Sequence, residues 1–215
     1  LHGQPEEVAA AVCAFDSLDH AVECVSATIQ SGIPMARIEF MDPMAMRAIN
    51  LQMGSDYREE PHLMIEFHGS PAAVREDAAR FGEIAAEFGA EGFDWATTAE
   101  DRARLWRMRH GAYHACLALR PGASGLITDV CVPISRLAEA LVGAKEEAEA
   151  LGHTTCIVGH VGDGNFHCSM LCDVNDTGEM ARGEEFMHRL VERAQAMGGT
   201  CTGEHGIGQG KQKYL

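Results

Sequence analysis

Short apolar runs alternate along the chain with segments whose apolar residues recur at helical spacing. Strands are predicted at residues 8–15, 35–40, 62–68, 125–133, 154–160 and 166–174. Helices are predicted between them: one ending near residue 32, others over 42–52, 70–89 and 99–119, one starting at 137, and one over 178–197. This recurring β-α-β order predicts an α+β fold. We expect ferredoxin-like β-α-β units that form a mostly antiparallel sheet with helices on one face.

No linker or low-complexity tract interrupts this pattern, so residues 1–215 are predicted to form a single domain. The sequence starts at Leu1 rather than Met, and it stops soon after a glycine-rich stretch. We therefore expect a fragment of a longer protein, and a targeting peptide cannot be read from this sequence.

The composition is that of an ordinary globular protein, with 46% hydrophobic and 23% charged residues. No stretch reaches the roughly 18 unbroken apolar residues that a membrane-spanning helix needs. The net charge is −15, and no basic cluster offsets it, so nucleic acid and anionic lipid are not expected as partners. The eight cysteines include no C-x-x-C pair, which predicts buried free thiols in a reducing compartment.

A turn sequence, Gly162–Asn165, separates the last two predicted strands. If those four residues form the loop, His160 pairs with His167 across the hairpin. Directly opposed residues have Cβ atoms about 4.5–5.5 Å apart, so both imidazoles can bind one metal ion. The alternative is two polar residues that are partly exposed near strand ends, and a third ligand is needed to decide.

The glycine-rich segment 198–211, GGTCTGEHGIGQGK, offers that third ligand. Adjacent side chains point apart in an extended backbone, so Glu204 can complete a His/His/Glu metal site while His205 faces a substrate. Three protein ligands with an open position are typical of catalytic metal sites. The alternative is a flexible loop with incidental charges. Neither of the two common glycine-rich nucleotide motifs, G-x-x-x-x-G-K-[ST] and G-x-G-x-x-G, is present.

Two arginines, Arg107 and Arg109, lie in the middle of a predicted helix, where arginine usually faces solvent. Arg107 fits that interpretation. Arg109 lies next to His110 and four residues before Tyr113, which makes it a candidate for a functional role.

Two motifs, GHVGDGNFH at Gly159–His167 and TCTGEHGIGQGK at Thr200–Lys211, resemble the C-terminal half of FAD-linked oxidases of the vanillyl-alcohol oxidase type. Within that family the chain is most similar to the D-lactate dehydrogenases (cytochrome). The similarity extends to residues 36–42, 66–70 and 105–137. It implies a flavoenzyme that oxidises a small D-2-hydroxy acid.

The resemblance also implies roles for individual residues. In that family a divalent metal (zinc, manganese or iron) is held at the positions that match His160, His167 and Glu204. The position matching His205 acts as the base, the one matching Arg109 holds the substrate carboxylate, and the one matching Asn165 lies close to the flavin.

The family further implies that FAD is bound mainly by an N-terminal domain, with contacts from a C-terminal tail. Both are expected to lie outside this sequence, which leaves the fragment inactive alone. The implied electron acceptor is a cytochrome c or a quinone. The implied location is cytoplasmic or peripheral to the inner membrane in a bacterium, and mitochondrial in a eukaryote.

Similar enzymes that take 2-hydroxyglutarate carry a lysine near the position of Ile127, in the strand before Asp129. Without a cation there, D-lactate or a slightly larger aliphatic relative is the expected substrate. Two alternatives stay open. One is a metal-dependent hydrolase, which an open His/His/Glu site also permits. The other is a non-catalytic ferredoxin-like binding module.

Overall fold

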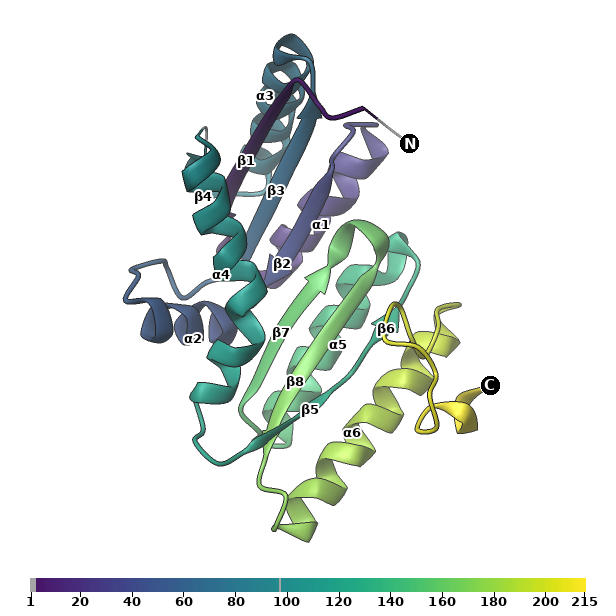
Figure 1. The fold of residues 1–215 in the computed structure, drawn as a ribbon. Helices are drawn as coiled ribbons and strands as arrows, with labels where there is room; N and C mark the ends of the chain where they lie inside the picture. The colour runs from purple at the N-terminus through teal and green to yellow at the C-terminus, as the bar shows by residue number, and fades with distance from the viewer. Residues whose placement is uncertain (1–2, 97) are drawn as a thin grey trace.

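The computed structural model describes residues 3–96 and 98–215, and these form one continuous, mixed sheet-and-helix structure (Figure 1). The described strands make an eight-stranded sheet in the order β4-β1-β3-β2-β7-β8-β5, with β6 also paired to β8. Every strand pair is antiparallel. The strands are β1 (Glu7–Ala14), β2 (Arg37–Met41), β3 (His62–Gly69), β4 (Glu91–Ala96), β5 (Ser124–Ile127), β6 (Val130–Cys131), β7 (Thr155–His160) and β8 (Asn165–Cys172).

The sheet joins two related halves edge to edge. In the first half the order β4-β1-β3-β2 is that of a ferredoxin-like unit, and in the second half β7-β8-β5 repeats three strands of the same order. The halves meet where β2 pairs with β7, at Phe40↔Gly159 and Met41↔Val158. Among the described residues that follow α6, the backbone pairing with the sheet is one isolated antiparallel bridge, between Thr200 and Cys131 of β6. The predicted α+β class and the antiparallel sheet of ferredoxin-like units are confirmed.

The α-helices lie on both faces of this sheet, where the sequence predicted one. They are α1 (Leu18–Gln30), α2 (Pro43–Met53), α3 (Pro71–Glu87), α4 (Ala99–Ala118), α5 (Leu137–Ala150) and α6 (Thr177–Ala196). Helices α1, α3, α5 and α6 share a core with Phe40, Ile65 and other strand residues of one face. Helices α2 and α4 pack on the opposite face, against Met41 and Met64. Apolar spacing shows that a helix has a buried side, but it does not say which sheet face that side meets.

The second face is the one that carries the candidate site. On this face, helices α2 and α4 cover the first half of the sheet, formed by β1, β3 and β2 (Figure 1). Strands β7 and β8 carry the two candidate histidines on this same face, because His167 pairs with Val158, which pairs with Met41 and packs with it against α2 and α4. The site therefore lies at the junction of the two halves.

Apart from shifts of one or two residues at strand ends, the predicted strands differ from the structure in two places. The run predicted at 125–133 is divided into β5 and β6, with Thr128 and Asp129 between them. At this interruption the Asp129 carboxylate accepts hydrogen bonds from Asn165, Thr202 and His205. Strand β4 was not predicted, because it is a short edge strand with mostly exposed side chains and no continuous apolar run.

The eight cysteines all lie in the described residues and are free thiols, seven of them buried, as predicted. Burial raises the pKa of Cys24 and of Cys168 to about 12, so these thiols stay protonated at neutral pH. In the described parts of the chain, no helix has both the length and the apolar character that a bilayer span requires.

A partly buried ion pair connects the start of α6 to the residues that follow α4. Glu179 accepts hydrogen bonds from both terminal nitrogens of Arg120 and from the backbone N–H of Asp173. The Arg120 guanidinium lowers the pKa of Glu179 to about 2, from an ordinary value of 4.5. Because the folded-state pKa is depressed, the pair stabilises the fold fully above pH 4.5 and stops doing so as the pH falls toward 2.

We therefore expect Glu179→Gln to lower the free energy of unfolding at neutral pH, and the difference from wild type to shrink between pH 4.5 and 2. Urea unfolding at a series of pH values measures this. Glu185→Gln on the same helix is the matched control, because Glu185 forms an exposed i,i+4 pair with Arg189. A difference for Glu179→Gln that stays constant across the acid range contradicts the assignment.

Candidate metal and substrate site

The β7–β8 hairpin places His160 and His167 on the same sheet face. The predicted pairing of His160 with His167 is wrong by two residues: His160 pairs with Asn165, and His167 pairs with Val158. Residues Val161–Asp163 form a 3-10 turn, so the four-residue loop runs from Val161 to Gly164, one residue earlier than predicted. Because the error is an even number of positions, both side chains still point to one face. Their ring centroids lie 5.7 Å apart.

Each imidazole is oriented by a hydrogen bond from its Nδ1 atom. The Nδ1 of His160 lies 2.8 Å from Oε1 of Glu39, and the Nδ1 of His167 lies 3.1 Å from the backbone oxygen of Thr128. Both partners accept hydrogen bonds, so in the neutral imidazoles both Nδ1 atoms carry the proton and both Nε2 atoms can bind a metal. The hydrogen bond with Glu39 raises the pKa of His160, while burial lowers the pKa of His167.

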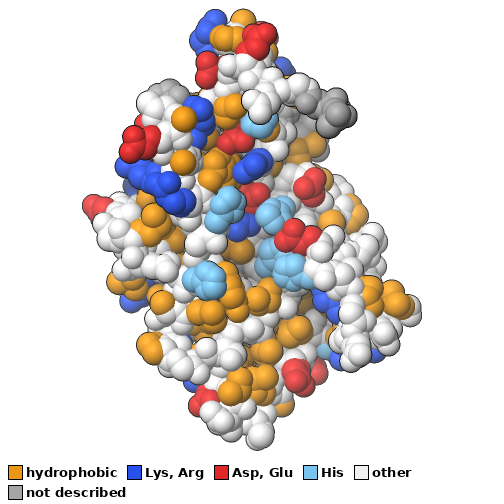
Figure 2. All heavy atoms as spheres, in the orientation of Figure 1, with side chains coloured by type: hydrophobic (Ala, Val, Ile, Leu, Met, Phe, Trp, Pro, Cys, Tyr) orange, Lys and Arg blue, Asp and Glu red, His pale blue; other side chains and the backbone are white. Residues whose placement is uncertain are grey.

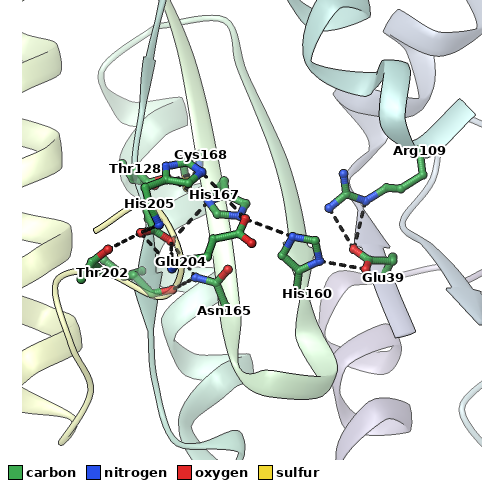
Figure 3. A network of polar contacts seen from close by, with 12 residues as sticks. Glu39, Arg109, Thr128, His160, Asn165, His167, Cys168, Thr202, Glu204 and His205 are labelled. Carbon is green, nitrogen blue, oxygen red and sulfur yellow. Dashed lines mark hydrogen bonds and ion pairs between the residues drawn. The ribbon is translucent and has the colours of Figure 1, made fainter. Parts of the chain in front are cut away.

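Glu204 completes the group from the glycine-rich segment. Its Oε1 lies 3.2 Å from Nε2 of His160 and 3.0 Å from Nε2 of His167. The three ligand atoms all lie within 4.8 Å of one another. The structure therefore brings the three predicted ligands together, although they come from three different segments (Figure 3).

The donor set fits a divalent cation. Nε2 of His167 is buried and has no hydrogen-bond partner among the residues that the structure describes. It lies 3.0 Å from Oε1 of Glu204, and in its Nδ1-protonated form it offers a lone pair to a cation. Two imidazole nitrogens and a carboxylate suit zinc, manganese or iron, and three protein ligands leave a position open for substrate.

Asp129 holds the glycine-rich segment in place. Its buried carboxylate accepts hydrogen bonds from the backbone N–H of His205 (2.9 Å) and of Glu204 (3.2 Å), and from the side chains of Thr202 (2.5 Å) and Lys211 (3.3 Å). Burial alone would raise the pKa of Asp129, but these hydrogen bonds outweigh burial and lower it. Asp129 thus stays ionised and fixes the backbone from which Glu204 and His205 project.

The base candidate, His205, stacks on His167 with ring centroids 4.8 Å apart and nearly parallel planes. Its Nε2 lies 3.8 Å from Oε1 of Glu204, and its side chain is 46% exposed. His205 thus lies beside the metal ligands and is open to a substrate. Asp129, His167 and His205 form a second group of possible ligands. That group is less suited to a metal, because both oxygens of Asp129 already accept hydrogen bonds.

Asn165 forms hydrogen bonds that help to hold Asp129 and the start of β6 in position. Its Nδ2 donates to Oδ1 of Asp129 and to the backbone oxygen of Val130, both at 2.9 Å, and its Oδ1 is buried. Gly203 packs directly on this amide, where an added Cβ would lie 2.0 Å from Nδ2. Only glycine fits there, so the amide and the glycine-rich segment keep each other in position. The contact of Asn165 with a flavin stays a prediction.

Arg109 lies on α4 and reaches the site through Glu39. Its Nε and Nη2 atoms lie 3.0 and 2.9 Å from Oε2 of Glu39, and only 13% of its side chain is exposed. Its third nitrogen points away from Glu39 (Figure 3). Arg109, Glu39, His160 and Glu204 therefore form a row in which guanidinium, carboxylate, imidazole and carboxylate alternate (Figure 3).

The open side of the site faces solvent. The side chains of Glu204 and His160 are 49% and 34% exposed, whereas that of His167 is 7% exposed. Histidines gather at the centre of the face shown in Figure 2, with basic and acidic side chains above them and apolar ones below. The two imidazoles are hydrogen-bonded to the protein at Nδ1, and the side of the site with Glu204 and His160 is open to solvent. Such a site can bind a small polar molecule.

Two residues that contact the candidate site residues, Glu39 and Asp129, were not predicted from the sequence as members of the site. Each is a single carboxylate inside an apolar run that predicts a strand. Buried carboxylates are rare unless they are paired, so a single carboxylate in an apolar run could have indicated a buried polar contact at these two positions.

Comparisons with known proteins find a matching sequence family, similar sequences and similar folds. The sequence family described as "FAD linked oxidases, C-terminal domain" matches residues 4–215. The chain is 47% identical over its whole length to "Probable D-lactate dehydrogenase, mitochondrial" from Danio rerio, covering 43% of that protein. It is 40% identical over 98% of its length to "D-lactate dehydrogenase [cytochrome], mitochondrial" from Arabidopsis thaliana, covering 37% of that protein. The chain thus spans less than half the length of either curated relative.

Among solved structures, the chain is similar to 4-ethylphenol oxidase from Gulosibacter chungangensis, crystallised as an isoeugenol complex. The TM-score is 0.69, with 14% sequence identity, over 93% of this chain and 46% of that one. At this identity the similarity concerns the fold.

Proposed function

The chain belongs to the family of FAD-linked oxidase C-terminal domains, and from that premise we propose that it forms the substrate- and metal-binding part of a flavin-dependent dehydrogenase. The proposed substrate is a small D-2-hydroxy acid, D-lactate first, which is oxidised to the 2-oxo acid. The observation that carries the proposal is the convergence of Nε2 of His160, Nε2 of His167 and Oε1 of Glu204, three atoms that lie within 4.8 Å of one another.

The residues of this chain divide the chemistry among them. Arg109 binds the substrate carboxylate through the edge of the guanidinium that Glu39 leaves free. His205 accepts the proton of the 2-hydroxyl group at Nε2, the ring atom that faces Glu204. His160, His167 and Glu204 would hold a divalent metal, which would supply Lewis acidity toward that hydroxyl group. FAD, when bound, supplies the acceptor for the hydride of C2.

The relatives suggest where FAD is held and where the electrons go. Because the matched region is less than half of either curated D-lactate dehydrogenase, we propose that most FAD contacts come from the remainder of such an enzyme. The electron acceptor is proposed to be a cytochrome c or a quinone. The eukaryotic relatives are named as mitochondrial, and a bacterial counterpart would act in the cytoplasm or peripherally on the inner membrane.

The substrate side chain is proposed to be short and aliphatic. Ile127 pairs with Ser169 on β8, so its side chain points to the same sheet face as that of His167. An isoleucine on this face offers no charge to a second substrate carboxylate. D-Lactate is therefore favoured over 2-hydroxyglutarate.

Substrate-dependent reduction of the flavin tests this proposal in the full-length protein. D-Lactate is expected to bleach the flavin absorbance under anaerobic conditions, L-lactate is not, and 2-hydroxyglutarate is expected to act more slowly. Hydrolysis of esters or phosphate esters, without flavin reduction by any 2-hydroxy acid, would favour the metal-dependent hydrolase instead. Absence of any bound divalent metal, together with absence of turnover, would favour a binding module.

Replacing Arg109 with lysine tests the carboxylate contact. Lysine keeps the positive charge but loses the planar fork. The KM for D-lactate is expected to rise at least about tenfold, because a hydrogen bond to a charged group contributes about 1.5–3 kcal/mol. Steady-state kinetics on the full-length enzyme measure this. Arg107→Lys, on the exposed side of the same helix, is the matched control. Equal KM values for the two variants would remove Arg109 from the substrate site.

A further inference from the structure

Glu39 is a buried carboxylate on β2 that contacts both parts of the proposed site. Oε1 lies 2.8 Å from Nδ1 of His160, and Oε2 lies 2.9 and 3.0 Å from Nη2 and Nε of Arg109. Glu39 is 8% exposed. Its partners are 121 and 70 residues away in sequence, so the contact joins three separate elements of the fold, β2, β7 and α4.

We propose that Glu39 is a positioning residue that prepares the metal ligand and the substrate-binding arginine together. On the metal side, it holds the proton of His160 on Nδ1, which leaves the Nε2 lone pair directed at Glu204. On the substrate side, it holds the Nε–Nη2 edge of Arg109, which leaves the terminal edge of the guanidinium for a substrate carboxylate. This inference rests on the proposed function, because it assigns Glu39 to that same site.

The two contacts require a carboxylate rather than an amide. His160 and Arg109 both donate to Glu39, so both oxygens must accept. A glutamine of the same size has one oxygen and one NH₂ group. It can accept from one partner only, and it turns a donor toward the other. The His160 ring then loses its orienting bond, or the Arg109 guanidinium moves.

The charge of Glu39 also separates two positive groups. The carboxylate lies between the Arg109 guanidinium and the imidazole that faces the metal position (Figure 3). Without it, a buried guanidinium and a divalent cation on the far side of His160 repel each other with little screening by water. Glu39 therefore favours the simultaneous presence of the metal and of a charged Arg109.

A second buried carboxylate on the same sheet face offers a matched control. Glu66 on β3 is 6% exposed and also binds α4, since it accepts a hydrogen bond from Nε1 of Trp106 at 2.5 Å. Its other close partner is His68, at 2.7 Å. The contacts found for Glu66 in the described residues include neither His160 nor Arg109. Glu66→Gln thus makes the same chemical change at similar burial outside the proposed site.

The experiment compares wild type, Glu39→Gln and Glu66→Gln as full-length proteins. Titration calorimetry with Mn²⁺ and with Zn²⁺ measures metal affinity, and steady-state kinetics separate KM from kcat for D-lactate. Selective ¹⁵N labelling of histidine reports the tautomer of His160 in the metal-free protein. Glu39→Gln is expected to weaken metal binding about 10–100-fold, as loss of an outer-sphere partner does, to raise KM, and to shift the His160 tautomer. Glu66→Gln is expected to change none of the three.

A further variant covers the case in which Glu39→Gln folds poorly. Glu39→Asp keeps the charge but is one methylene shorter, so it reaches one partner and is expected to lose part of the metal affinity or part of the substrate affinity. The role of Glu39 is overturned if Glu39→Gln, or Glu39→Asp in its place, matches wild type in metal affinity, KM and tautomer. If the wild-type protein binds neither Mn²⁺ nor Zn²⁺, the proposed function itself is overturned. Calorimetry on the wild type distinguishes this result from one that overturns only the role of Glu39.

Discussion

Replacing Glu204 with glutamine in the full-length protein is expected to weaken divalent-metal binding by more than about 100-fold. Mutating a residue that only orients a metal ligand already weakens binding about 10–100-fold, and this change removes a ligand itself. The physical reason is the position of Oε1 of Glu204, which faces the Nε2 atoms of both histidines. An amide supplies a weaker ligand and no negative charge. The kcat/KM for D-lactate is expected to fall with the metal, while FAD stays bound. Metal analysis by mass spectrometry and single-turnover flavin reduction measure the two effects.

Glu192→Gln is the matched control for that change. Glu192 also contacts a histidine, with 3.4 Å between its Oε1 and Nε2 of His188, but on the exposed surface of α6. It is expected to leave both metal content and turnover as in wild type. His160→Ala is expected to behave as Glu204→Gln does. If both site variants keep the metal at full occupancy, His160 and Glu204 are not its ligands.

Replacing Asp129 with asparagine is expected to destabilise the fold by about 3 kcal/mol, the lower end of the cost of breaking a buried ion pair. The carboxylate is buried and serves side-chain and backbone donors, including the ammonium of Lys211. Asparagine replaces one acceptor oxygen with a donor that faces those groups. Since the same hydrogen bonds position Glu204 and His205, metal affinity is expected to fall as well.

Urea unfolding of the full-length protein and metal titration measure the two effects of Asp129→Asn. Asp163→Asn is the control, because Asp163 has an exposed side chain in the nearby β7–β8 turn. We expect that control to change stability by less than about 0.5 kcal/mol, as exposed substitutions do. Wild-type stability in Asp129→Asn would show that the glycine-rich segment holds its shape without this carboxylate.

The shared sheet face of the two proposed ligands His160 and His167 could be predicted from the sequence, because the argument depended only on strand parity. A hairpin with a loop of even length puts His160 and His167 on one face, whichever of several registers forms. The actual register differs by two residues, and the conclusion about the face is unchanged. The register itself depends on the 3-10 turn, and on Gly164, whose φ of +77° and close approach to the backbone oxygen of Val132 only glycine tolerates.

The contacts that orient those ligands could not be predicted, because they join residues far apart in sequence. Glu39 meets His160 and Arg109 only after β2 pairs with β7 and α4 packs on the second sheet face. Periodicity predicts that α4 exists and where it ends, but the side of the sheet on which it packs is a tertiary property. The sequence therefore predicted helix α4, but not that it packs on the second sheet face and brings Arg109 to the site.

The most direct measurement of the central claim is anaerobic reduction of the flavin by D-lactate in metal-loaded, chelator-treated and re-metallated full-length protein. Removing the metal is expected to slow flavin reduction by at least about 100-fold, since a Lewis acid contributes several kcal/mol to such a step. Restoring the metal is expected to restore the rate in wild type but not in Glu204→Gln. Flavin reduction at the same rate in metal-free and metal-loaded protein would contradict a metal-assisted role for His160, His167 and Glu204.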